Sequence, residues 1–274
     1  MFRFRKAIRI GLPSLLFALA LAPAAAGQSA ADVLETAMAR FEDRMSGIDN
    51  YTVVMDVMGF EATNYFEKEM VDGRPTFVLK SSSGSDQQGA GTFYNSFMQV
   101  ADRATLAGMQ YVDGFDCHVV TVDDFSGIDF DPETPDDQED FKPRKGTFYI
   151  DTGEYLIREL EMEGEFRRDG SWHPTTMKIE LKDYREVDGM LHPFLLEMSV
   201  AGMNNAMSDE EMQQARESLE EMKRRLEEMP ASQRAAMERM MGSRMEELER
   251  MLNSGNVQVI SQVKELKVNS GPPN

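Results

Sequence analysis

Histidine and cysteine, which often carry out catalysis or bind metals, are few in this chain. The three histidines are His118, His173 and His192, and the one cysteine is Cys117. No His-Glu-x-x-His spacing and no pair of cysteines is present, so the sequence predicts no metal site of the zinc type. Cys117 and His118 are adjacent, and on a strand they would point to opposite faces, which disfavours a thiolate–imidazole pair. We therefore interpret Cys117 as a buried structural residue.

Two further signatures of enzymes are missing from the sequence. There is no Gly-x-Ser-x-Gly elbow, and the glycine-rich residues 84–91 lack the lysine and the spacing of a phosphate-binding loop. Carboxylates are plentiful, but no spacing marks a pair of them as a general acid and base. We expect no catalytic residues, no cofactor and no enzymatic activity.

An acidic segment, residues 123–140, holds nine carboxylates and no basic side chain. Alternating carboxylates at Asp129, Asp131 and Glu133 could wrap a calcium ion, which prefers oxygen ligands. The EF-hand pattern fails, because its glycine and glutamate positions, counted from Asp129, hold threonine and aspartate. A solvated acidic loop is the favoured interpretation, and a calcium site is the alternative.

The N-terminus has the three-part pattern of a secretory signal. Four basic residues come first, an apolar stretch follows over residues 10–22, and small side chains occupy most of residues 23–27. The apolar stretch is shorter than the roughly 20 residues of a membrane-spanning helix. We expect a signal peptide over residues 1–26, cleavage after Ala26, and export to the periplasm of a Gram-negative type of envelope without a transmembrane anchor.

The charge of the chain narrows the classes of partner. The formal net charge is −19 at pH 7, and removal of the leader, which carries four basic residues and no acidic one, makes it −23. Such a charge repels nucleic acids and anionic lipid head groups. We therefore expect no nucleic-acid partner. A hydrophobic content of 41% predicts a packed core rather than disorder.

Hydrophobic periodicity separates one helix from a long series of strands. Residues 31–46 have apolar side chains at the spacing of one helical face, with Asp32 and Glu35 as a capping box. From Tyr51 the period changes to two, the period of a strand with one buried face. Because the connections are short turns, we expect a mainly β (α+β) fold with a long, twisted antiparallel sheet. The expected strands are residues 51–57, 64–71, 76–80, 92–100, 109–112, 117–122, 146–150, 155–164, 175–184, 194–200 and 257–269.

Residues 208–252 interrupt the β pattern and predict a helical hairpin inserted between two strands. Ser208 and Glu211 form a capping box, and apolar residues then follow a coiled-coil spacing as far as Pro230. A second helix carries a stripe of methionine and leucine. The two stripes either pack on each other or also offer a methionine-rich face to a ligand or partner. Residues 270–274 are interpreted as a disordered tail.

The order of these elements resembles the LolA-like outer-membrane lipoprotein-sorting family. The similarity lies in the signal, the first helix, the meander, the stretch from Tyr149-Ile150-Asp151 to Ile157, residues 184–193, and a last strand that ends in Val268-Asn269. It implies one domain over residues 27–269, a curved antiparallel sheet that forms an incomplete β-barrel covered by helices. It also implies that the apolar concavity holds acyl chains. The hairpin and the acidic segment depart from the family pattern, so the resemblance does not identify the cargo.

Ligand contacts are expected on the apolar face of the sheet. Each buried methylene of an acyl chain contributes about 0.8 kcal/mol, so about ten of them would offset about 8 kcal/mol of exposure. The competing interpretation is that the same side chains fill a core without a cavity. Two functional hypotheses follow, a carrier or sensor of lipid or lipoprotein acyl chains, and an envelope protein-interaction module that uses the hairpin without lipid. The predicted contact residues are Val53, Met55, Phe77, Leu79, Phe148, Ile150, Met177, Ile179, Leu181, Leu196 and Met198.

Overall fold

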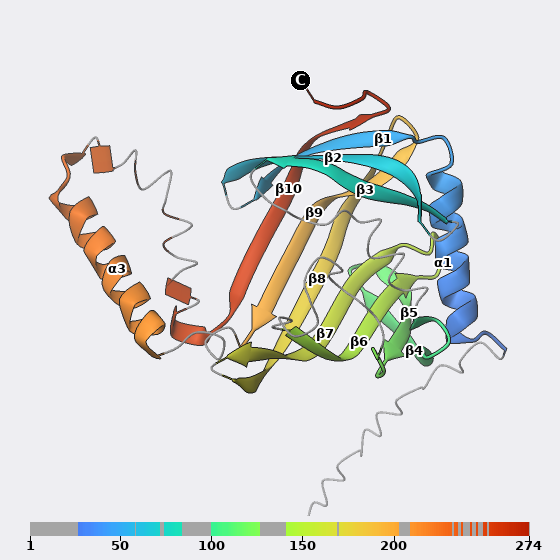
Figure 1. The fold of residues 1–274 in the computed structure, drawn as a ribbon, viewed down its shortest axis with the longest axis horizontal. Helices are drawn as coiled ribbons and strands as arrows, with labels where there is room; N and C mark the ends of the chain where they lie inside the picture. Colours follow the sequence, from blue (N-terminus) through green and yellow to red (C-terminus); the bar gives the residue numbers. More distant parts are fainter. Residues whose placement is uncertain are drawn as a thin grey trace, which may run out of the picture.

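The computed structural model describes residues 27–57, 59–71, 74–83, 100–126, 141–168, 170–202, 209–231, 233–234, 237, 242, 245, 249–250 and 252–273. Within them, ten strands form one antiparallel sheet in the order β3-β2-β1-β10-β9-β8-β7-β6-β5-β4. The sheet curves strongly without closing into a barrel, and β3 and β4 are its two edges (Figure 1). The predicted fold class, a mainly β protein with an incomplete barrel, is confirmed.

The strands β1 to β3 and β4 to β9 are each neighbours in chain order, but β3 and β4, which follow one another in the chain, lie at opposite edges of the sheet. The last strand, β10, lies between β9 and β1 and joins the two parts of the sheet. Most strands are longer than predicted, because pairing with both neighbours continues beyond the apolar positions. The bounds are β1 (Asn50–Val57), β2 (Phe60–Val71), β3 (Arg74–Ser83), β4 (Thr105–Val112), β5 (Phe115–Val122), β6 (Phe141–Asp151), β7 (Ile157–Arg168), β8 (Ser171–Val187), β9 (Met190–Ala201) and β10 (Val257–Val268).

Several predicted segments lie outside the described residues. They are the signal peptide, residues 1–26, the glycine-rich residues 84–91, residues 92–99 of one expected strand, and residues 127–140 of the acidic segment. The calcium alternative therefore stays a prediction.

The first helix, α1 (Ala30–Arg44), lies along the open side of the curved sheet, between the β1–β3 strands and the β4–β5 hairpin (Figure 1). Its N-cap is Ser29, whose Oγ accepts the N–H of Asp32 at 3.2 Å while Asp32 Oδ2 accepts the N–H of Ser29 at 2.8 Å. The predicted capping box of Asp32 with Glu35 is wrong, because Asp32 occupies the third helical position rather than the cap. At the other end, Lys68 Nζ donates to the Met45 carbonyl at 2.7 Å, which stabilises the negative end of the helix dipole.

Two apolar clusters hold α1 against the sheet. The larger cluster joins Val33, Leu34 and Met38 of α1 to side chains of β5–β8. The smaller cluster joins Met45 and Ile48, which follow α1, to side chains of β1–β3, β9 and β10. The helix therefore connects the two arms of the curved sheet on its open side.

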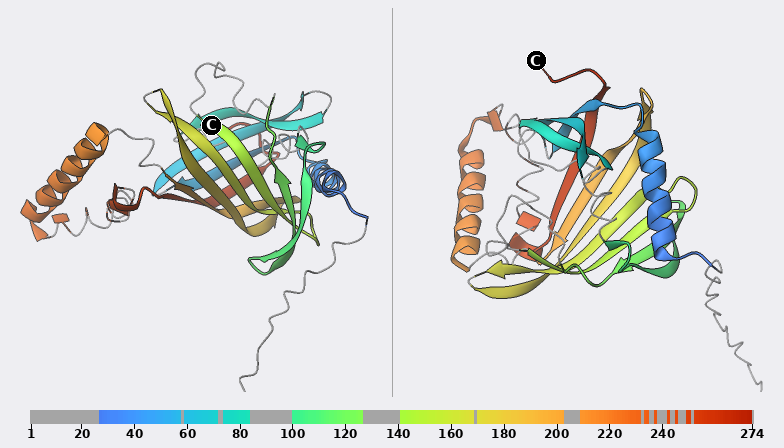
Figure 2. Two further views of the ribbon diagram at one scale, coloured as in Figure 1. Left: turned by 90° about the horizontal axis from the view of Figure 1, so that it is seen from below. Right: turned by 45° about the vertical axis from the view of Figure 1, so that its right-hand side comes forward.

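The inserted hairpin stands apart from the sheet. Its first helix, α3 (Asp209–Glu228), lies beyond the ends of β9 and β10 (Figure 2). Leu219, Leu226 and Leu252 are buried, and Lys223 Nζ lies 3.1 Å from a Glu249 oxygen. These contacts support the interpretation that the two arms pack on each other. Ser208 of the predicted capping box and much of the second arm lie outside the described residues.

The hairpin connects β9 to β10, and these two strands are neighbours in the sheet. This agrees with the prediction that the hairpin is inserted between two strands. Val200 of β9 lies opposite Val257 of β10, so the sheet continues directly across the insertion. No helix in the described part of the chain is both long and apolar enough to span a membrane.

The chain remains attached to the sheet after β10. Asn269 has a positive φ of 52°, and its Oδ1 accepts the N–H of Asp49 at 2.7 Å. The N–H of Gly271 donates to Asn50 Oδ1 at 2.9 Å. Asn269 therefore fixes the start of β1, and the chain is still hydrogen-bonded to the sheet at Gly271, within the segment predicted as a disordered tail.

Candidate functional site

The inner face of the sheet, defined as the face that carries both apolar clusters, is the candidate site. On β8, Met177, Ile179 and Leu181 alternate with charged residues, and all three contribute to the larger cluster. The eleven predicted contact residues divide between the clusters. Phe148, Ile150, Met177, Ile179, Leu181, Leu196 and Met198 belong to or pack against the larger one, and Val53, Met55, Phe77 and Leu79 belong to or pack against the smaller one.

Six of these eleven residues are core residues in this structure. Each is at most 7% exposed, so its surface is already occupied by protein contacts. They are Val53, Phe77, Phe148, Ile150, Ile179 and Leu181. The other five, Met55, Leu79, Met177, Leu196 and Met198, are half-buried and retain surface that a ligand could contact.

Cross-strand pairing places three of these half-buried residues, Met55, Met177 and Met198, opposite valines that were not predicted as contacts. Met177 lies opposite Val200, which lies opposite Val257, and Met198 lies opposite Val259. On the far side of β10, Met55 lies opposite Val263. We call this set the apolar strip. Its members, all half-buried, are Met55, Val57, Met177, Leu196, Met198, Val200, Val257, Val259 and Val263.

The apolar strip holds no charged side chain, although 28% of the chain is charged. Its one polar neighbour in register is Ser261, which lies between Leu196 and Val57. The strip extends over β8, β9, β10 and β1. Several of its residues pack against the buried clusters but remain partly accessible. This surface is suited to an apolar ligand and lacks groups that could bind a charged one.

The outer face of the same strands has the opposite character. Lys178 Nζ lies 3.0 Å from Glu159 Oε2, and Lys182 Nζ lies 2.9 Å from Glu197 Oε2. Burial raises the pKa of Glu159, while the Lys178 ammonium acts in the opposite direction. The sheet therefore separates a charged outer face from an apolar inner face, as expected for a sheet with one wet side.

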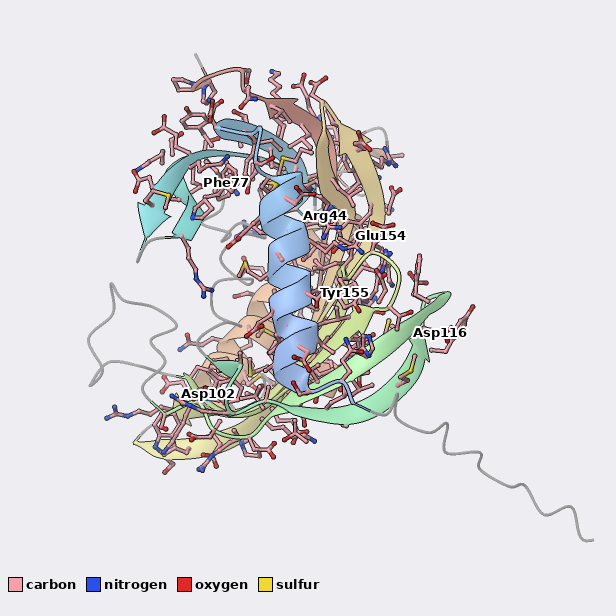
Figure 3. All side chains as sticks on the ribbon, turned by 90° about the vertical axis from the view of Figure 1, so that its right-hand side faces the viewer. Arg44, Phe77, Asp102, Asp116, Glu154 and Tyr155 are labelled. Carbon is pink, nitrogen blue, oxygen red and sulfur yellow. The ribbon has the colours of Figure 1, made fainter. Side chains whose placement is uncertain are left out.

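The turn between β6 and β7 attaches α1 to the sheet. Arg44 Nη1 donates to the carbonyl of Glu154 at 2.9 Å, and the guanidinium of Arg40 lies 5.9 Å from the ring centre of Tyr155. Figure 3 shows Arg44, Glu154 and Tyr155 along the side of α1. Tyr184 Oη donates to the carbonyl of Ile157 at 2.7 Å. Two of the stretches on which the sequence resemblance rests, residues 149–157 and 184–193, are thus in direct contact at this turn.

The residues with catalytic potential do not form a site in the described chain. The histidines lie on three strands, β5, β8 and β9, and no group of three His, Cys, Asp or Glu among the described residues could hold a metal ion. Cys117 is fully buried, as predicted. Burial, with a contribution from the Asp151 carboxylate, raises the pKa of its thiol to about 11.

Solved structures with a similar fold include three that match over most of both chains. A DUF1329 family protein from Desulfovibrio piger has 12% identity, covers 90% of this chain and 96% of its own, and gives a TM-score of 0.41. A Vibrio parahaemolyticus domain provisionally described as an outer membrane lipoprotein-sorting protein has 8% identity over 88% and 95%, with a TM-score of 0.40. A LolA superfamily protein from Nitrosomonas europaea has 9% identity over 87% and 94%, with a TM-score of 0.35.

No protein-family model and no curated protein matches the sequence. Two of the three similar structures carry the names of the group that the sequence resembles, and at these identities the likeness concerns the fold alone.

Proposed function

We propose that the apolar strip binds the acyl chains of a lipid or a lipoprotein, and that the protein is an exported, periplasmic and non-enzymatic carrier or sensor. The observation that carries the proposal is the contrast within the inner face. Six of the predicted contact residues are buried in the core and have no surface left for a ligand. The residues of the apolar strip lie next to one another across paired strands and are only half-buried. An acyl chain would complete the burial of these side chains.

The energetics favour a ligand with an apolar chain. Removing about ten methylenes from water contributes about 8 kcal/mol, which acts against the entropy cost of association and of ordering one flexible chain. The methionines of the strip, Met55, Met177 and Met198, have unbranched and polarizable side chains that adapt to chains of different length. The absence of charge from the strip favours recognition by the tail of the lipid rather than by its head group.

The experiment compares two adjacent residues of β10 that lie on opposite faces. Val259 belongs to the apolar strip, whereas Ile260 is 45% exposed and lies opposite Glu197 of the outer face. Val259→Gln and Ile260→Gln introduce the same polar group at adjacent positions of one strand, on opposite faces of the sheet. The readout is the fluorescence of dansylaminoundecanoic acid on titration with each purified protein.

Val259→Gln is expected to weaken probe binding about tenfold, because a buried amide without a partner costs about 1–3 kcal/mol. Ile260→Gln is expected to bind the probe as the unchanged protein does. Equal affinities for the two variants, or no binding of the probe by the unchanged protein, would contradict the proposal. Thermal unfolding of both variants controls for a loss of structure.

For the second hypothesis, an interaction module that uses the hairpin, no accessible apolar surface comparable to the strip is observed on the described part of α3. The apolar stripe of α3 is engaged at Leu219 and Leu226, both of which are buried. A docking role would need these leucines to be released from their present contacts.

A further inference from the structure

The two edges of the sheet differ in their protection against strand pairing. The edge strand β3 carries Arg74, Pro75 and Lys80, and charged residues and proline at an edge oppose the addition of another strand. The edge strand β4, Thr105–Val112, has the sequence TLAGMQYV, with no charged residue and no proline. Among the described residues, no strand pairs with its outer edge. A neutral edge is unusual in a chain of which 28% is charged.

Two side chains of β4 expose apolar surface next to this edge. Met109 is 48% exposed and Tyr111 is 69% exposed. As residues two apart on a strand, they point to the same face. Their partners across the hairpin are His118 and Asp116. An added strand could therefore place alternate apolar side chains beside Met109 and Tyr111.

The turn determines which backbone groups point away from the sheet. Asp113 and Gly114 form a two-residue turn with φ of 47° and 91°, the type I′ geometry in which the flanking pair, Val112 and Phe115, is hydrogen-bonded. Hydrogen-bonded positions alternate along the strand. The N–H and C=O groups of Tyr111 and Met109 therefore point outward, where another strand could pair with them.

The usable edge is short. The register of β4 with β5 shifts between Leu106 and Gly108, and Gly108 has a φ of 135°. Such a bulge bends the strand and ends regular pairing. The free edge thus runs from Gly108 to Val112, which suits a single extended peptide of a few residues.

The charges beside the edge indicate the chemistry of the added strand. The β4–β5 hairpin carries Asp113 and Asp116 and no lysine or arginine, and Asp116 lies next to its turn, to one side of α1 in Figure 3. At the other end of β4, the side chains of Asp102 and Asp124 are 81% and 60% exposed, and Arg103 offsets one of these charges. Acidic side chains therefore flank β4 at both of its ends. A strand with basic residues at its ends would complement them.

A second copy of this chain does not fit the edge. In an antiparallel pair of two β4 strands that places Met109 of one copy opposite Tyr111 of the other, Asp113 would lie opposite Ala107, and β4 has no basic side chain to offset its charge. The net charge of −19 adds a long-range repulsion between copies. We therefore propose that the outer edge of β4 accepts an extended polypeptide segment with alternating apolar side chains and basic ends, which adds to the sheet as an eleventh strand.

The test uses the purified protein and a short blocked peptide of alternating valine and threonine with lysine at each end, studied by calorimetric titration. Two comparison peptides have glutamate at the ends, or N-methyl groups on the amides that would face β4. The proposal predicts binding of the lysine-ended peptide that weakens as salt is added. It also predicts weaker binding of the glutamate-ended peptide and none of the N-methylated one.

A pair of variants at one position separates the backbone from the side chain. Tyr111→Ala keeps the outward N–H, whereas Tyr111→Pro removes it without affecting the hydrogen bonds to β5. We expect Tyr111→Pro to bind the peptide about fivefold more weakly than Tyr111→Ala, the ratio that one backbone hydrogen bond contributes. Asp113→Asn suits the type I′ turn, and it is expected to reduce both the affinity and its salt dependence.

Three results would overturn the proposal. They are equal binding by Tyr111→Pro and Tyr111→Ala, equal binding of the lysine-ended and glutamate-ended peptides, and the absence of any binding. Sedimentation velocity tests whether a second copy of the chain binds the edge instead of a peptide. A concentration-dependent dimer that Tyr111→Pro abolishes would assign the edge to a second copy of the chain instead. Circular dichroism of each variant establishes that the sheet is intact.

Discussion

Asp151 and Arg158 form a buried ion pair across the turn between β6 and β7, with 2.9 Å between Oδ2 and Nη2. Their side chains are 3% and 9% exposed. The carboxylate of Asp151 also accepts backbone N–H groups of Gly153, Glu154 and Leu156, at 3.1, 2.6 and 3.3 Å. The buried charge is therefore fully hydrogen-bonded, and it determines the path of the turn to which α1 is attached.

Asp151→Asn should destabilise the protein strongly, because it leaves the guanidinium of Arg158 buried without a counter-charge. Loss of one partner of such a pair costs about 3–5 kcal/mol, and urea unfolding at neutral pH measures it. The double variant Asp151→Asn with Arg158→Met should recover much of this loss, since it removes the orphaned charge. Equal destabilisation by the single and double variants would show that the hydrogen bonds to the turn, rather than the charge, are what matters.

The alternation of side chains along each strand could be predicted from the sequence. The three apolar residues Met177, Ile179 and Leu181 lie on one face as expected, and the sheet continues from β9 to β10 across the inserted hairpin. Both features follow from local patterns, a period of two and a change to a helical period. The N-cap was misplaced by three residues, because Asp32 is itself a good capping residue and the local pattern cannot distinguish it from Ser29.

The candidate site could be predicted only in part, for a reason that lies in tertiary structure. Alternation identifies the inner face but not which of its residues α1 covers, so Phe148 and Ile150 appeared equivalent to Met198. Val200 and Val257 join the apolar strip because they are paired across β9 and β10, which are separated in the chain by the hairpin. Such adjacency depends on the register of distant strands, which a single sequence does not specify.

Leu34→Ala tests whether α1 is an integral part of the core. Leu34 is 2% exposed in the larger cluster, so its truncation should lower the free energy of unfolding by about 3 kcal/mol. Glu35→Ala, at the next and exposed position, is the matched control and should change it by less than about 0.5 kcal/mol. Similar small effects of both variants in chemical denaturation would mean that α1 covers the sheet only loosely.

His192 should make stability depend on pH below neutrality. Burial lowers the pKa of its imidazole to about 4 from an ordinary value of 6.5, with the Pro193 carbonyl acting in the opposite direction. Between these values the unfolded chain binds a proton that the native protein does not, so stability falls as the pH decreases through this window. At pH 4 the loss reaches about 3 kcal/mol.

The comparison with His192→Gln isolates this contribution from that of the carboxylates. Urea unfolding between pH 7 and pH 4 should give a steeper loss of stability for the unchanged protein than for the variant. Parallel curves would show that His192 gains its proton in the native protein as readily as in the unfolded chain.

Replacement of the hairpin by a short turn between β9 and β10 tests its independence from the sheet. The strand ends at Val200 and Val257 are already opposite each other, so a tight turn can join them without strain. The buried residues Leu219, Leu226 and Leu252 lie within the hairpin itself. We therefore expect the shortened protein to keep its sheet and its melting temperature, as measured by circular dichroism. Dansylaminoundecanoic acid then distinguishes the two roles of the hairpin, because unchanged affinity places the acyl site wholly on the apolar strip, whereas weakened binding would mean that the hairpin covers the bound chain.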